Sequence, residues 1–110
     1  MNRHGLAICA LLIALGLGAA SDASAGTDDG VAALRAGDAA KAMTEFQAAA
    51  KQGDARAMYL IGRMNHEGRG VAVNEAEAVN WYKKAADKDN PDAENALGMM
   101  YASGKPMAKD

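Results

Sequence analysis

The sequence predicts an all-α protein in which pairs of helices stack as a solenoid. The pattern at residues 61–64, followed by a glycine at 68, returns 36 positions later at residues 97–100, followed by a glycine at 104. No segment alternates apolar and polar residues in the way that is typical of a strand. A fixed period of this length, built from helical segments, is typical of stacked helix-pair repeats.

The first 25 residues predict a secretory signal peptide. A short basic start precedes the apolar run Leu6–Ala20, which contains no charged side chain, and Ala23-Ser24-Ala25 then supplies a small-x-small cleavage pattern. The apolar run is shorter than the roughly 20 residues that a transmembrane helix needs. We therefore expect a periplasmic or secreted bacterial protein, cleaved after Ala25, that does not insert stably into a membrane. A retained anchor is the alternative.

The composition of the remaining chain, residues 26–110, limits its chemistry. It contains no cysteine, since Cys9 is the only one in the sequence, so no disulfide can stabilise it. Without Arg3 and Asp22, 11 of the 12 basic and 13 of the 14 acidic side chains remain. This near-neutral balance, without charged blocks, argues against a nucleic-acid or anionic-membrane partner. The length suits one small domain.

The first two helices of that domain are predicted from turn residues and apolar spacing. A weak helix over residues 28–36 ends at Gly37. Asp38 can cap the next helix, in which apolar residues at 39, 42, 43, 46, 49 and 50 follow the spacing of one helix face. Gly53 closes this helix, because glycine adopts the left-handed conformation at little cost.

Three further helices are expected over residues 55–67, after Asn74, and after Asn90-Pro91. Asn74 with Glu77 forms a capping-box-like pair, and Pro91 occupies the first helical position, where its missing amide proton is harmless. A glycine-containing turn at residues 68–71 joins the first two of these helices. Gly104 and Pro106 end the last.

Gly62 and Gly98 both lie inside predicted helices, where glycine costs about 1 kcal/mol relative to alanine. Their equivalent positions predict a shared steric need, which is the close approach of a neighbouring helix. Phe46, Trp81 and Tyr82 are expected to fill the wider gaps between helices. Met58, Met99 and Met107 are expected at the surface.

The segment from Ala57 to Ala86 resembles the Sel-1-like repeat, a relative of the tetratricopeptide repeat. The matching residues are Ala57, Ile61-Gly62-Arg63-Met64, Gly68-Arg69-Gly70-Val71, Asn74, Ala78, Trp81-Tyr82-Lys83-Lys84 and Ala85-Ala86. The resemblance implies a right-handed α–α superhelix. It divides the chain into a partial first repeat (26–53), a complete repeat (54–89) and a partial terminal repeat (90–110).

Two features depart from the family pattern. Asn65 stands where the family usually has an aromatic residue. The chain also stops at Asp110, the counterpart of Asn74, so the helix that would cover Leu97, Met100 and Tyr101 is missing. We therefore expect a partial fragment of a longer array, a homodimer through the uncapped C-terminal helix, or a partner that supplies the missing helix.

No catalytic residue, cofactor or metal site is predicted. His66 is the only histidine that remains after cleavage, so neither a zinc cluster nor a Cys–His pair can form. Ser103 has no identifiable base and is expected to be a helix-end residue. Most carboxylates lie at helix termini, as the helix dipole favours. We therefore predict that the protein is not an enzyme.

The resemblance instead implies an interaction or scaffold module that binds a protein or peptide on its concave face. In this repeat class the first helix of each pair lines that face, which groups Tyr59, Arg63 and His66 with Asn95 and Met99. Tyrosine and arginine are enriched at binding hot spots. An ordinary polar helix face is the alternative.

A different function class remains open. Some cysteine-rich proteins with similar repeats are linked to β-lactam binding or hydrolysis, which would make this chain a periplasmic β-lactamase-like hydrolase. The chain lacks their paired cysteines.

Overall fold

The computed structural model describes residues 24–104, and residues 1–23 and 105–110 fall outside this description. A first helix covers residues 24–35. It is followed by α2 (Ala39–Lys51), α3 (Ala55–Glu67), α4 (Glu75–Ala86) and α5 (Pro91–Ser103). No strand occurs among residues 24–104, so the all-α prediction is confirmed. The predicted signal peptide lies almost entirely outside the described residues, as do Pro106 and Met107.

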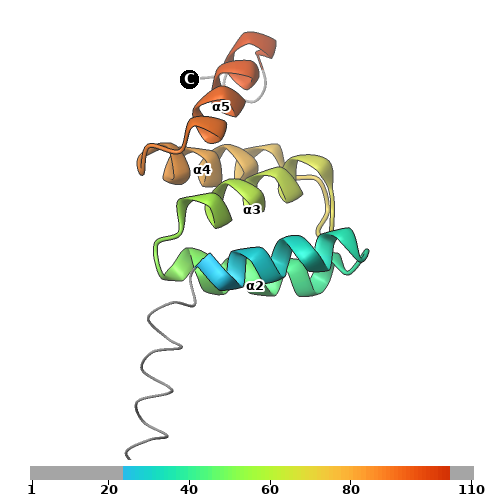
Figure 1. The fold of residues 1–110 in the computed structure, drawn as a ribbon. Helices are drawn as coiled ribbons and strands as arrows, with labels where there is room; N and C mark the ends of the chain where they lie inside the picture. Colours follow the sequence, from blue (N-terminus) through green and yellow to red (C-terminus); the bar gives the residue numbers. More distant parts are fainter. Residues whose placement is uncertain (1–23, 105–110) are drawn as a thin grey trace, which may run out of the picture.

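The helices stack in the order in which they follow one another along the chain. Figure 1 shows α2 at one end of the stack, α3 and α4 in the middle, and α5 at the other end. Helix α3 packs against α2 and, more extensively, against α4, which in turn contacts α5. Because each helix is covered mainly by its neighbours in sequence, the arrangement is a solenoid of helix pairs.

Side chains that accept backbone amide protons determine where the helices begin. The N-terminal caps of α2 to α5 are Asp38, Asp54, Asn74 and Asn90. Helices α3 and α5 both end at a glycine with left-handed backbone geometry, Gly68 with φ of 74° and Gly104 with φ of 78°. The equivalent ends of the two helices confirm the predicted repeat at the level of backbone conformation.

The close approach predicted at Gly62 is present between α3 and α4. A Cβ atom added at Gly62 would lie 2.7 Å from the ring of Tyr82 and 3.2 Å from the carbonyl oxygen of Ala78. At Gly98 the same prediction is wrong for the described residues. An added Cβ atom there would meet no atom within 4 Å, because no described helix covers that face of α5.

The core consists mainly of alanine and methionine with a few larger side chains. Its larger side chains include Phe46, Ile61, Met64, Tyr82 and Leu97. Asn65, the departure from the family pattern, is also buried. Its side-chain amide donates to the carbonyl oxygen of Ile61 at 3.0 Å, so the polar group is satisfied within its own helix.

Trp81 is partly buried and packs against the core, as expected, and the ammonium nitrogen of Lys84 lies 4.3 Å from the centroid of its ring. Two expectations about individual residues need correction. Met58 is buried rather than exposed. The first helix already includes residue 24, four positions before its predicted start. This helix makes tertiary contacts that a local sequence pattern does not reveal.

Those contacts join the first helix to α2 and α3. The buried hydroxyl of Thr27 donates to the carboxylate of Asp54, the residue that caps α3. Gly30 lies directly against the ring of Phe46 in α2.

None of the helices in residues 24–104 is long and apolar enough to cross a bilayer.

Candidate functional site

A groove of about 490 Å³ lies between α3 and α5, with residues of α4 forming part of its lining. The five residues that the sequence grouped on one face all line this groove: Tyr59, Arg63, His66, Asn95 and Met99. They come from two successive repeat units, separated by α4 in the chain. Their proximity is therefore a property of the fold, and their role in binding a partner stays a prediction.

Seven further residues line the groove without having been predicted: Glu67, Glu75, Tyr82, Asp92, Ala96, Met100 and Ser103. The helical spacing along α5 could have indicated Asp92 and Ser103, because each lies three or four residues from Asn95 or Met99. Glu75 and Tyr82 belong to α4. The apolar pattern of one helix does not specify which residues of the next helix reach its polar face.

The apolar part of the lining comes from tyrosine and methionine side chains. The ring centroids of Tyr59 and Tyr82 lie 5.7 Å apart with the planes tilted by 33°. Tyr59 is partly buried and packs against the core. Met99 on α5 is 71% exposed, as expected. Burial raises the pKa of Tyr82 well above its ordinary value.

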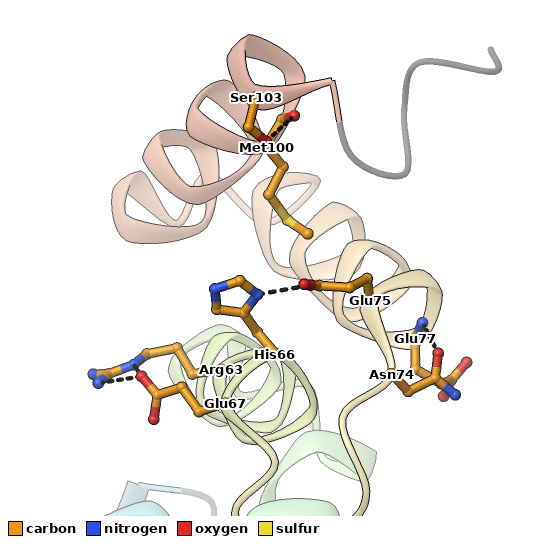
Figure 2. A network of polar contacts seen from close by, with 8 residues as sticks. All are labelled: Arg63, His66, Glu67, Asn74, Glu75, Glu77, Met100 and Ser103. Atoms are coloured by element: carbon orange, nitrogen blue, oxygen red, sulfur yellow. Dashed lines mark hydrogen bonds and ion pairs between the residues drawn. The ribbon is translucent and has the colours of Figure 1, made fainter.

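Two pairs of polar side chains form the polar edge of the groove (Figure 2). Arg63 contacts one carboxylate oxygen of Glu67 through Nη2 at 2.9 Å and through Nε at 3.3 Å. The hydrogen bond to Glu67 raises the pKa of Arg63. His66 Nδ1 lies 2.7 Å from Glu75 Oε1, which links α3 to the first turn of α4.

Two polar side chains on α5 remain available at the opposite wall. Asp92 and Asn95 are exposed, and neither side chain makes a hydrogen bond or ion pair within residues 24–104. Ser103, by contrast, donates its hydroxyl to the carbonyl oxygen of Met100 at 2.9 Å, which is the helix-end role predicted for it. No group of three metal-binding side chains was found in the described part of the chain. The arrangement is suited to binding a ligand through shape, charge and hydrogen bonds.

Comparison with known proteins gives the repeats a name. The family model for the Sel1 repeat matches residues 55–90 and 91–110. The chain belongs to the Sel1 repeat family. Its identification from the residue pattern is thereby confirmed.

Solved structures of the same fold agree with this assignment. The Sel1 repeat protein from Oxalobacter formigenes is 30% identical, with a TM-score of 0.71 over 76% of this chain and 36% of that protein. A protective antigen present in uropathogenic Escherichia coli strains, which displays an SLR fold, is 27% identical. Its TM-score is 0.72 over 79% of this chain and 20% of that protein. The predicted helical repeat solenoid is therefore confirmed.

Two curated eukaryotic proteins are also similar to this Sel1 repeat chain. The ERAD-associated E3 ubiquitin-protein ligase component HRD3A of Arabidopsis thaliana is 37% identical over 84 residues, which is 72% of this chain and 12% of the relative. Chitin synthase regulatory factor 3 of Schizosaccharomyces pombe is 40% identical over 57 residues, which is 52% of this chain and 6% of the relative. The chain thus spans a small part of the length of both relatives.

Proposed function

We propose that this Sel1 repeat chain is an exported interaction or scaffold module that binds a protein or peptide in the groove between α3 and α5. The observation that carries the proposal is that five residues, grouped by their spacing on two helices, line one groove. The two curated relatives are named as a component of a ubiquitin ligase and as a regulatory factor, which supports a role alongside other proteins.

The chemistry of the groove favours recognition of a polypeptide. Tyrosine side chains offer large contact areas with few rotatable bonds, and methionine adapts its shape to irregular partners. The amide of Asn95 can both donate to and accept from a peptide backbone. The volume of about 490 Å³ is in the range of ligand-binding clefts and suits a few side chains of an extended segment. This mode of binding needs no cofactor and no catalytic group.

Export is part of the proposal and rests on the pattern of the first 25 residues. Their basic start, apolar run and small-x-small motif are those of a cleaved secretory signal. Determination of the N-terminal residue of the protein purified from producing cells tests this part. A chain that begins at Gly26 supports export, and a chain that retains the apolar run refutes cleavage.

Photo-crosslinking in cells that produce the full chain tests the binding surface. A benzophenone amino acid replaces Met99 in the groove or, as a matched control, Val73. Val73 is also a large exposed hydrophobic residue, 59% exposed, but it lies in the loop before α4 and outside the groove. We expect a discrete protein adduct from position 99 and none from position 73.

The adduct should depend on the predicted contact residues. Replacing Tyr59 and Arg63 with alanine removes an aromatic surface and a cation from the groove, so the adduct from position 99 should disappear. Circular dichroism of this double variant checks that it still folds, because Tyr59 also packs on Tyr82. An adduct that survives in the folded double variant, or equal adducts from positions 99 and 73, would refute the proposed groove.

The predicted homodimer concerns a different surface, the outer face of α5. Gly98 has open space above it, and Tyr101 is 51% exposed. These observations support the face as an interface between two copies of the chain. Sedimentation equilibrium tests this proposal, since a monomer mass at all concentrations would refute it.

A further inference from the structure

The charges that line the groove do not balance. Three carboxylates contribute, from Glu67, Glu75 and Asp92, against one guanidinium from Arg63 and one imidazole from His66. Even with a protonated imidazole, one negative charge remains in excess, and with a neutral imidazole the excess is two. A concave surface with an excess of one sign of charge concentrates ligands of the opposite sign.

The contacts distinguish the carboxylate on α5 from the other two. Arg63 is held by Glu67, which Arg69 also reaches at 4.0 Å from outside the groove, and His66 is held by Glu75. Figure 2 shows both groove pairs on the α3 and α4 side. Asp92 is the carboxylate that has no ion-pair partner among residues 24–104. It lies in the first turn of α5, where the positive end of the helix dipole favours an acidic side chain.

Apolar surface lies in the same groove as this carboxylate. Tyr59 and Tyr82 form an aromatic pair, and Met99 and Ala96 follow Asp92 along α5. A ligand that fits both features has a cationic group close to an apolar one. An anionic ligand would have to displace Glu67 from Arg63 while it approached three carboxylates, which costs Coulomb energy.

We propose that the groove binds a basic peptide segment, in which a lysine or arginine side chain pairs with Asp92 and an adjacent apolar side chain packs on Tyr59 and Met99. This inference rests on the proposed peptide-binding function and specifies the chemistry of the partner. The pairing selects for positive charge, and the apolar contact supplies most of the affinity because exposed ion pairs contribute little.

Fluorescence anisotropy with three labelled synthetic peptides tests the inference. The basic probe alternates leucine with lysine, and the acidic and neutral probes carry glutamate or glutamine in place of each lysine. The intact protein should bind the basic probe at least about tenfold more tightly than the acidic one, because the two probes differ in sign at every charged position. The affinity for the neutral probe should lie between the affinities for the other two.

Three variants at two positions in the first turn of α5 separate the effect of the groove from that of the overall charge of the protein. Asp92→Asn removes the carboxylate that α5 contributes to the groove. It should weaken binding of the basic probe about fivefold, as expected for the loss of an exposed ion pair. Glu94→Gln removes an exposed carboxylate from the same turn that does not line the groove, and should leave the preference unchanged. Asp92→Lys should shift the preference toward the acidic probe.

The outcomes distinguish this inference from the function on which it rests. Equal affinity for basic and acidic probes would overturn the basic specificity, and so would an equal loss in Asp92→Asn and Glu94→Gln. Failure of all three probes to bind would also overturn it, while a Met99 crosslink that depends on Tyr59 and Arg63 would still support peptide or protein binding. Loss of that crosslink specificity overturns the proposed function itself.

Discussion

Alanine at Gly62 and alanine at Gly98 should have opposite effects on stability, although the two glycines are equivalent in the repeat. In a helix interior, replacing glycine with alanine stabilises the helix by about 1 kcal/mol. At Gly98 nothing opposes this gain, because the new methyl group meets open space. At Gly62 the methyl group would lie 2.7 Å from ring carbons of Tyr82 and 3.2 Å from the carbonyl oxygen of Ala78.

The clash at Gly62 should outweigh the helical gain. Tyr82 is 2% exposed and packed between neighbours, and the carbonyl oxygen of Ala78 belongs to the backbone of α4, so neither can move cheaply. Overpacking of this kind costs about 1–3 kcal/mol. The expected net change is a loss of roughly 1 kcal/mol for Gly62→Ala and a gain of up to about 1 kcal/mol for Gly98→Ala.

Thermal unfolding followed by circular dichroism at 222 nm measures both changes. For a domain of this size, 1 kcal/mol shifts the midpoint by about 4–8 °C. Gly62→Ala should therefore melt several degrees below the parent protein, and Gly98→Ala should melt a few degrees above it. An unchanged or higher midpoint for Gly62→Ala would refute the close approach of α3 and α4. A lower midpoint for Gly98→Ala would mean that another surface covers that face of α5.

Two other substitutions probe a polar link and a buried phenol. Asp54→Ala should destabilise the fold by about 2 kcal/mol, because α3 loses its cap and the buried hydroxyl of Thr27 loses this acceptor; urea unfolding measures the change. Tyr82→Phe should reduce the alkaline loss of stability. Burial raises the folded-state pKa of Tyr82, so its contribution is complete below about pH 10 and is lost as pH rises further. Urea midpoints between pH 8 and 11 measure this effect.

A matched control variant exists for both the Asp54→Ala and the Tyr82→Phe experiments. Asp38→Ala removes the cap of α2 alone, so it should cost about half as much as Asp54→Ala. Equal losses would argue against a stabilising contribution from the Thr27 contact. For the pH series, the exposed Tyr101 offers the same substitution outside the core, and Tyr101→Phe is the matched control. A slope that persists in Tyr82→Phe would assign the alkaline loss to other groups.

Helices α3 and α5 show how much of the fold the sequence can predict. Their caps, their apolar spacing and their terminal glycines are local signals, and the structure places the helix ends at the residues that those signals indicate. The 36-residue offset then predicts that both helices have the same environment. That inference holds for Ile61 and Leu97, which are both buried.

The repeat is less informative where neighbours differ. Gly62 is covered by α4, whereas no described helix covers Gly98. The presence of glycine at both positions does not reveal this difference. The composition of the groove also depends on neighbouring helices. The spacing of residues on α3 and α5 placed five side chains on one face, but the contributions of Glu75 and Tyr82 depend on how α4 packs between the two helices.

The bond between Thr27 and Asp54 has a consequence for how the protein would mature. Removal of the leader after Ala25 would make Thr27 the second residue of the new terminus, and Asp28, which pairs with Arg56 at 2.9 Å, the third. A peptidase that cut only a few bonds further along would delete both links between the first helix and α3. The accuracy of processing would then determine whether the mature chain keeps these two polar contacts.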